Sequence, residues 1–205
     1  NTLENISTTA DKAWGMQIKD QVTRVEIVNN SIRDIQGPSD DTAGIQLTTK
    51  FVSDGPSSVE IFESEFDSVG IGVDVAGNTD GNNVSITTTE FVNNSNYGVR
   101  NSASGTVDAT LNWWGAASGP SGGVDDPETG ETADGTGASV SANVTFDPWY
   151  LDEARTVLSN ASGDVNVQES IEADASDFEV STSNFQEVDE NSGGSLVVEG
   201  SDGTT

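Results

Sequence analysis

The chain has 205 residues, of which 33% are hydrophobic, and it contains neither cysteine nor histidine. The absence of both residue types excludes disulfides, thiolate sites and a Ser-His-Asp triad. Its 35 acidic residues against 7 basic ones give a net charge of −28, which has the wrong sign for binding nucleic acid. No apolar run approaches the length of a membrane span, so none is expected in this chain.

The N-terminal part contains a sequence repeat. Residues 1–6 (NTLENI) match residues 30–35 (NSIRDI), and residues 14–18 (WGMQI) match residues 43–47 (AGIQL). Both pairs share an offset of 29 residues, with no gap between them. A fixed period of this size is the signature of architectures built from stacked repeats.

A second element occurs four times and sets the length of each predicted coil. Its copies are residues 25–32 (VEIVNNSI), 59–66 (VEIFESEF), 84–91 (VSITTTEF) and 107–114 (VDATLNWW), whose starts are 34, 25 and 23 residues apart. A glycine and an apolar residue follow the first three copies, at Gly44-Ile45, Gly70-Ile71 and Gly98-Val99. Each coil is therefore predicted to contain three short strands, joined by one tight corner and by loops of variable length.

Apolar and polar residues alternate along these copies, which predicts the side chains of the core. Val25 and Ile27 flank Glu26, so they should point inward while Glu26 faces solvent. Stacked coils would form two inward columns, Val25 with Val59, Val84 and Val107, and Ile32 with Phe66, Phe91 and Trp114. We therefore predict an all-β fold, a right-handed parallel β-helix (a solenoid) with coils of about 23–34 residues.

These coils resemble the parallel β-helix repeats of the pectate-lyase-like superfamily, which includes enzymes, sugar-binding surface proteins and viral tailspikes. Residues 111–120 (LNWWGAASGP), followed by residues 144–150 (VTFDPWY), resemble a block that closes such helices in secreted microbial proteins. The resemblance implies an extracellular or cell-surface location. Together with the acidic composition, it implies a secreted or surface protein of a halophilic archaeon.

The chain divides into two predicted parts. Residues 1–150 comprise the β-helix coils and the closing block, and residues 151–205 form an acidic C-terminal segment. Within this segment, residues 178–185 (FEVSTSNF) match residues 84–91 in residue type, which predicts a further coil or a capping strand after a linker. A flexible acidic tail is the alternative.

Carboxylates recur at one outward position of successive coils, and these are the candidate catalytic residues. Glu26, Glu60 and Asp108 share this position, and Glu65 and Glu90 share another. Two carboxylates about 5–9 Å apart can cleave a glycosidic bond. A hydrated acidic surface is the alternative, and we favour it because no aromatic cluster accompanies these acids in the sequence.

A candidate metal site lies in residues 74–83 (DVAGNTDGNN). Asp74, Asn78 and Asp80 supply oxygen ligands at close spacing, as Ca²⁺ requires. The segment lacks the residue order of an EF-hand and its closing glutamate, and an ordinary glycine-asparagine turn has the same composition. We therefore expect either no cofactor or a bound Ca²⁺ at this segment.

Two tryptophans are candidate carbohydrate-binding residues. The indole rings of Trp113 and Trp114 can stack on sugars, since such rings combine a large apolar face with a polar edge. The alternative is that these side chains, with Trp149, cap the end of the core. We favour capping, because such residues more often close the end of a core and the Pro148-Trp149 corner suits that role.

Six Asn-x-Ser/Thr sequons are candidate glycosylation sites of an exported protein. They lie at Asn5, Asn29, Asn83, Asn93, Asn143 and Asn160. Because the chain is rich in these residue types, several sequons arise by chance, and they permit glycosylation without requiring it.

Three functions fit these observations. The first is a non-catalytic extracellular or cell-surface β-helix module for adhesion, glycan contact or assembly in high salt, whose partners are glycans or other surface proteins. The second is a carboxylate-dependent polysaccharide-active enzyme, either a glycoside hydrolase or a lyase. The third is a segment of a viral tail or spike. The composition favours the first, since no recognisable catalytic motif is present.

The net charge also predicts that the fold depends on salt. Like charges on neighbouring strands destabilise a sheet, and mobile cations must screen them, with a Debye length of about 3 Å at about 1 M salt. We expect the β-sheet circular-dichroism signal to weaken progressively as KCl or NaCl is removed. Repeating the titration with a chelator separates screening from Ca²⁺ binding at residues 74–83. An unchanged spectrum and melting temperature at low millimolar salt would contradict the prediction.

Overall fold

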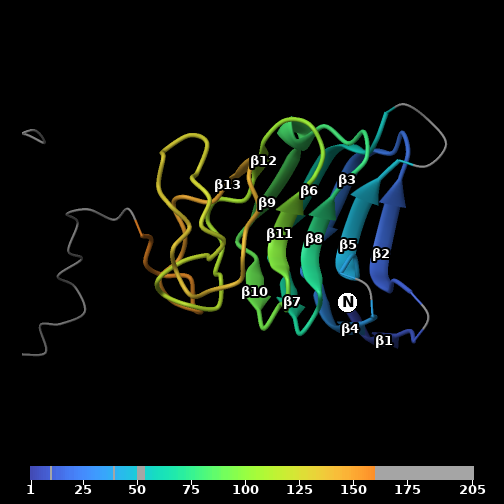
Figure 1. The fold of residues 1–205 in the computed structure, drawn as a ribbon, viewed down its shortest axis with the longest axis horizontal. Helices are drawn as coiled ribbons and strands as arrows, with labels where there is room; N and C mark the ends of the chain where they lie inside the picture. Colours follow the sequence, from blue (N-terminus) through green and yellow to red (C-terminus); the bar gives the residue numbers. More distant parts are fainter. Residues whose placement is uncertain (10, 39, 50–53, 160–205) are drawn as a thin grey trace, which may run out of the picture. The chain divides into compact units, whose positions relative to one another are not determined.

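The computed structural model describes residues 1–159, apart from residues 10, 39 and 50–53 (Figure 1). Every regular element among them is a β-strand, except for the short 3₁₀ helix η1 (Gly81–Asn83), so the predicted all-β class is confirmed for this part. It contains no helix with the length and hydropathy needed to cross a bilayer. The described residues belong to one compact unit, Asn1–Ser162. The coil or capping strand predicted at residues 178–185 lies outside the described residues.

The strands form three parallel sheets, named here A, B and C. Sheet A contains β1 (Thr2–Ser7), β4 (Ser31–Gln36), β7 (Glu65–Asp67) and β10 (Glu90–Val92). Sheet B contains β2 (Trp14–Lys19), β5 (Ala43–Thr48), β8 (Ile71–Val75) and β11 (Tyr97–Asn101). Sheet C contains β3 (Thr23–Val28), β6 (Ser57–Phe62), β9 (Val84–Thr87), β12 (Val107–Asp108) and β13 (Val144–Thr145).

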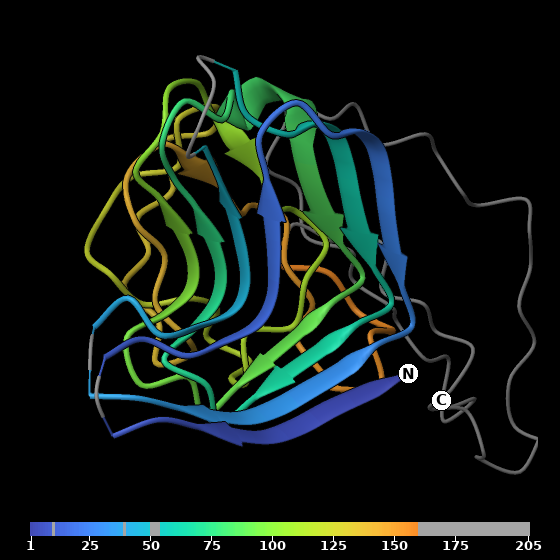
Figure 2. The same ribbon diagram turned by 90° about the vertical axis from the view of Figure 1, so that its right-hand side faces the viewer.

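From β1 to β12 the chain visits the three sheets in rotation. β1 lies in sheet A, β2 in sheet B and β3 in sheet C, and β4 then returns to sheet A beside β1. Figure 2 shows the three sheets surrounding a common interior. We call each group of three consecutive strands a repeat, so the chain contains four repeats from β1 to β12.

The register between repeats agrees with the offsets found in the sequence. Leu3 pairs with Ile32 and Met16 pairs with Ile45, which is the predicted shift of 29 residues. In sheet C, Val59 pairs with both Val25 and Val84, so the predicted valine column is in register. Parallel strands with matching patterns place like residues beside one another, and this produces continuous columns through the core.

The largest core column joins Ile32, Phe66, Phe91 and Trp114, as predicted, and all four are fully buried. The ring centroids of Phe66 and Phe91 are 5.3 Å apart, and those of Phe91 and Trp114 are 5.0 Å apart. The rings of both pairs are stacked and nearly parallel, with interplanar angles of 9° and 17°. Stacked aromatic rings add about 0.5–1.5 kcal/mol per pair beyond the burial of their area.

Glycines of sheet B make room for this column. A Cβ atom at Gly44, Gly72 or Gly98 would lie 2.7–2.9 Å from the ring of Phe66, Phe91 or Trp114, respectively. The sequence comparison aligned Gly70 with Gly44, and this alignment is wrong by two residues. Ile45 pairs with Val73, so the glycine equivalent to Gly44 is Gly72. The loop between β7 and β8 is shorter than the loop between β4 and β5, and the sequence alignment was therefore shifted by two residues.

The corner between sheets C and A has the same backbone conformation in each repeat. Asn29, Glu63, Thr88 and Leu111 adopt positive φ angles of 53°, 50°, 46° and 55°. Residues other than glycine rarely adopt this region, and asparagine tolerates it best. A single left-handed residue therefore turns the chain sharply enough to bring the next strand under the core.

A ladder of polar side chains lies next to this corner. The Asn30 N–H donates to Ser64 Oγ at 3.3 Å, Ser64 N–H to Thr89 Oγ1 at 3.4 Å, and Thr89 N–H to Asn112 Oδ1 at 2.8 Å. Ser64, Thr89 and Asn112 are buried. These side chains accept hydrogen bonds from backbone N–H groups that the sharp turn leaves without sheet partners. No N–H group of this ladder is therefore buried without an acceptor.

The segment after β12 is joined to the core through Asp126, which is only 2% exposed. Its Oδ1 accepts N–H groups of Glu128 and Thr129, and its Oδ2 accepts those of Phe146 and Asp147. Burial by itself raises a carboxyl pKa, but these four backbone donors hold the pKa of Asp126 below its ordinary value. The long connection and the end of β13 are thereby tied together.

The folded unit continues past the boundary predicted at residue 150. Leu151 N–H donates to Val157 O at 2.8 Å, and Ser159 N–H donates to Trp149 O at 2.8 Å. Tyr150 and Leu158 form an antiparallel bridge. Residues 151–159 therefore belong with the closing block, because their backbone pairs with it, rather than with the acidic C-terminal segment.

An aspartate in the valine column tests the inward assignment. Val84 is 2% exposed and pairs with Val59. We expect Val84→Asp to cost several kcal/mol, about the stability of a small domain, and therefore to unfold the protein. The matched variant Ser85→Asp, at the next and outward position of β9, should remain folded. Equal melting temperatures of the two variants would contradict the assignment.

Candidate functional site

The predicted carboxylate row lies on the outer face of sheet C. Glu26 pairs with Glu60, Glu60 with Ser85, and Ser85 with Asp108, so the shared outward position is confirmed. Ser85 Oγ donates to Asp108 Oδ2 at 3.2 Å and separates this acid from Glu60. Among the described residues, none forms an ion pair with Glu26 or Glu60. This row is an exposed acidic face.

A second outward row lies on sheet A, and it combines acids with an aromatic ring. Ser31 pairs with Glu65, Glu65 with Glu90, and Glu90 with Trp113. Because Phe91 and Trp114 point into the core, their neighbours Glu90 and Trp113 project from the opposite face. The Trp113 side chain is partly exposed. The sequence predicts the pair of Glu65 and Glu90, and the alignment of residues 84–91 with residues 107–114 contains the signal that Trp113 continues this row.

The two glutamates of this row have different surroundings. Glu65 Oε2 accepts a hydrogen bond from Ser31 Oγ at 2.7 Å and an ion pair from Arg33 Nη2 at 2.9 Å. Glu90 has no such partner among the described residues. Burial, and then repulsion from Glu153 and Glu65, raises the pKa of Glu90 above its ordinary value. The two carboxyl groups therefore differ in their environment, and burial makes the charged form of Glu90 less favourable.

This arrangement has two possible chemical uses. Trp113 can pack against one sugar ring of an extended glycan, while Glu90, Glu65 and Ser31 hydrogen-bond the hydroxyl groups of this unit and the units that follow along the row. The same row also places two carboxyl groups on strands about 4.8 Å apart. That spacing is close to the roughly 5–5.5 Å separation found in retaining glycosidases. Glu90, whose pKa is raised, would be the proton donor of such a pair, and Glu65 would be the nucleophile.

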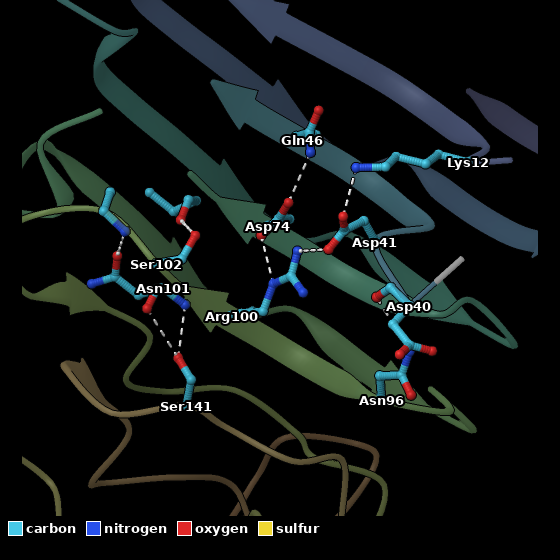
Figure 3. Close-up of polar contacts among 12 residues, drawn as sticks. Lys12, Asp40, Asp41, Gln46, Asp74, Asn96, Arg100, Asn101, Ser102 and Ser141 are labelled. Atoms are coloured by element: carbon cyan, nitrogen blue, oxygen red, sulfur yellow. Dashed lines mark hydrogen bonds and ion pairs between the residues drawn. The ribbon is translucent and has the colours of Figure 1, made fainter. Parts of the chain in front are cut away.

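The outer face of sheet B holds a third polar row, which contains the predicted metal ligand Asp74. Asp74 lies between the core residues Val73 and Val75, so its side chain projects from the other face of β8. Its carboxylate accepts hydrogen bonds from Arg100 Nε and Gln46 Nε2, both at 2.9 Å (Figure 3). These neighbours leave Asp74 0% exposed, with its charge neutralised by Arg100.

Arg100 also joins this row to the loop before β5. Its Nη2 lies 2.8 Å from Asp41 Oδ1, and Lys12 Nζ lies 2.6 Å from Asp41 Oδ2 (Figure 3). Hydrogen bonds from Lys12 and Arg100 hold the pKa of Asp41 below its ordinary value. Two of the seven basic residues of the chain are thus committed to one structural network.

The other two predicted metal ligands have different partners from Asp74. Asp80 caps η1, where its carboxylate accepts from Asn82 N at 3.1 Å and from Asn83 Nδ2 at 3.0 Å. Asn78, Asp80 and Asp54 line a hollow of about 410 Å³. Within the described residues, no group of three or more acidic side chains is placed to hold a metal ion. Ca²⁺ binding stays a prediction, and Asp74 is already occupied by Arg100.

The two candidate sugar-binding tryptophans differ in their exposure to solvent. Trp114 is 0% exposed and stacked on Phe91, so it is a core residue and is not available on the surface for a glycan. Trp113 remains accessible on sheet A. Trp149 packs at the end of the core, and its Nε1 donates to Ala117 O at 3.2 Å. The capping interpretation therefore fits Trp114 and Trp149.

The described sequons lie on the surface. Their asparagines are exposed, namely Asn5, Asn29, Asn83, Asn93 and Asn143. The Nδ2 atoms that would carry a glycan donate hydrogen bonds in two of them, from Asn83 to Asp80 and from Asn93 to Asp67. Glycosylation stays a prediction for these five sites, and Asn160 lies outside the described residues.

The raised pKa of Glu90 predicts a pH-dependent stability. Because the folded pKa exceeds the unfolded value of about 4.3, the folded state binds more protons between the two, and stability falls as pH rises through this window. Glu90→Gln removes the buried charge. We therefore expect this variant to melt above wild type at about pH 7 and to lose that advantage below about pH 4.

The matched control is Glu60→Gln, which removes one charge from the exposed row of sheet C. It reports the general effect of lowering the net charge. Thermal melting in molar salt over the pH range compares the three proteins. A Glu90→Gln curve that coincides with the Glu60→Gln curve at every pH would contradict the prediction.

Comparison with known proteins adds no relative to this picture. No family model matches the chain, and neither a curated protein nor a solved structure matches it. The resemblance to parallel β-helix proteins therefore rests on the repeat itself. The function has to be argued from the residues and rows described above.

Proposed function

We propose that the four repeats form a right-handed parallel β-helix. The support is the strand order, in which every third strand joins the same sheet, all pairings between repeats are parallel, and the register is continuous. The hand of the coil follows from a general rule, since crossover connections between parallel strands of one sheet are right-handed in about 98% of cases.

The proposed function is a non-catalytic extracellular or cell-surface module that contacts glycans in high salt. The observation that carries it is the sheet A row, in which the accessible Trp113 continues a line of hydrogen-bonding side chains formed by Ser31, Glu65 and Glu90. Parallel strands hold this row rigid and nearly flat, so little side-chain freedom is lost when an extended ligand binds across it.

The proposed setting follows from composition. A chain with 35 acidic and 7 basic residues stays hydrated and soluble in strong salt, where the repulsion between its charges is screened. The absence of cysteine makes the fold independent of disulfide formation. These properties suit a secreted or surface protein of a salt-adapted organism, and the exposed sequons are compatible with it.

A second candidate function is carboxylate-dependent cleavage of a glycan. The specific observation in its favour is that Glu65, which forms an ion pair with Arg33, lies beside Glu90, whose pKa is raised. This asymmetry is what an acid and a nucleophile require. We rank it second because both side chains lie on an open sheet face, where water competes with substrate.

A binding experiment separates the two functions. In molar salt, wild type should be retained on at least one immobilised neutral polysaccharide. Trp113→Ala should bind about tenfold more weakly, because it removes one stacking surface. Glu60→Gln on sheet C is the matched control and should bind as wild type does.

Two outcomes would overturn the proposal. Equal retention of wild type and Trp113→Ala would remove the sheet A row as the contact surface. Release of new reducing ends by wild type, abolished in Glu90→Gln, would establish the enzyme in place of the non-catalytic module. Circular dichroism confirms that each variant is folded before binding is compared.

A further inference from the structure

The outer face of sheet A holds more negative than positive charge around Glu90. The acidic side chains whose charges act on Glu90 are those of Glu65 and Asp67 on β7 and of Glu153 in the closing block. The nearby cations are Arg155, which attracts Glu90, and Arg33, which forms an ion pair with Glu65. Carboxyl groups therefore outnumber cations on this part of the face, and some of its negative charge is uncompensated.

The uncompensated charge is concentrated on Glu90. The carboxylate of Glu65 is paired with Arg33 at 2.9 Å, and Asp67 accepts a hydrogen bond from Asn93 Nδ2 at 3.0 Å. In contrast, the carboxyl group of Glu90 makes neither an ion pair nor a side-chain hydrogen bond within the described part of the chain. Its neighbours on β7 have partners, and it does not.

Arg155 does not neutralise Glu90 by direct contact. Its Nη1 donates to the backbone O of Thr88 at 3.0 Å, and no ion pair joins it to Glu90 among the described residues. Glu90 is also partly buried, and a desolvated carboxylate is costly unless a cation meets it. Glu90 is therefore the carboxyl group of this face that gains most from a cation supplied by a ligand.

Trp113 distinguishes this position from a plain acidic surface. It pairs with Glu90 and projects from the same face, so the carboxyl group and the indole ring lie one strand spacing apart, about 4.8 Å. The face of an indole ring attracts cations and also packs against the apolar side of a sugar ring. A cation carried by a sugar is held by both contacts, and this lets it compete with the free K⁺ or Na⁺ of a concentrated salt solution.

We propose that the sheet A row binds glycans that carry ammonium groups, that is, amino sugars without an N-acetyl group, in preference to neutral glycans. The ammonium group, with its three N–H donors, binds the carboxylate of Glu90, while the sugar ring that carries it packs against Trp113. Hydroxyl groups of the following units reach Glu65 and Ser31. This inference rests on the proposed glycan contact and names the class of glycan.

Three tetrasaccharides test the preference, because they differ only in the substituent beside the anomeric carbon. They are tetramers of glucosamine, N-acetylglucosamine and glucose with the same β linkage, titrated into the complete chain in molar NaCl by calorimetry. At about pH 6 an amine of this kind is protonated and an ordinary glutamate is ionised. Wild type should bind the glucosamine tetramer about tenfold more tightly than either neutral tetramer.

Two matched variants locate the preference. Glu90→Gln keeps the size of the side chain and removes its charge, so the ratio of the glucosamine affinity to the neutral affinities should fall to about one. Glu60→Gln removes the same charge from the exposed row of sheet C and should retain the wild-type ratio. It controls for the general attraction between an acidic protein and a cation. Trp113→Ala should weaken the binding of all three tetramers.

The pH dependence of binding gives a second readout. Protonation of Glu90 removes the charge that holds the ammonium group, and its pKa is raised. The affinity of wild type for the glucosamine tetramer should therefore fall as the pH is lowered from about 6, while the affinity for the neutral tetramers stays constant. Glu90→Gln should lack this fall. The other charged groups that face Glu90 are the same in both proteins, namely Glu65, Asp67, Glu153 and Arg155.

The outcomes separate this inference from the proposed function. Equal affinities for the three tetramers, no binding of the glucosamine tetramer, or a preference that persists in Glu90→Gln would overturn the inference. A preference lost equally in Glu60→Gln would overturn it as well, since the attraction would then belong to the acidic surface as a whole. Retention on a neutral polysaccharide that depends on Trp113 would survive each of these results, so the proposed function could stand while the preference fails.

Discussion

The structure depends on parallel pairing that keeps equivalent residues of successive repeats in register. This register places Phe66, Phe91 and Trp114 in one stacked column, and glycines on sheet B leave the space that the rings need. It also lines up the left-handed corner residues and the polar ladder beside them. Each repeat has too little apolar surface to fold alone, so the columns link the repeats into one cooperative unit.

The same register that builds the core also organises the surface. Outward side chains form rows at one strand spacing, and the composition of each row decides its electrostatics. On sheet C the row is acidic, and none of its carboxylates forms an ion pair with a described residue. On sheet B, by contrast, Arg100 neutralises the buried Asp74. On sheet A, Arg33 stabilises the charge of Glu65, and its neighbour Glu90 is left with a raised pKa.

The candidate glycan-contact surface lies on the regular strands of the fold. The sheet A row is a rigid linear surface, suited to an extended ligand, and Trp113 gives it an apolar face. Regular strands fix the positions of functional side chains, so little entropy is lost when a ligand binds.

The sequence by itself determined the all-β class, the 29-residue offset, the inward columns and the row of Glu26, Glu60 and Asp108. These features depend on alternation along a strand and on equal spacing between repeats, which are local properties. Only the tertiary structure decided that Arg100 pairs with both Asp74 and Asp41, and that Asp126 ties the long connection to the end of β13. Those outcomes depend on loops of unequal length, whose paths are set by the residues they meet in space and not by the period of the sequence.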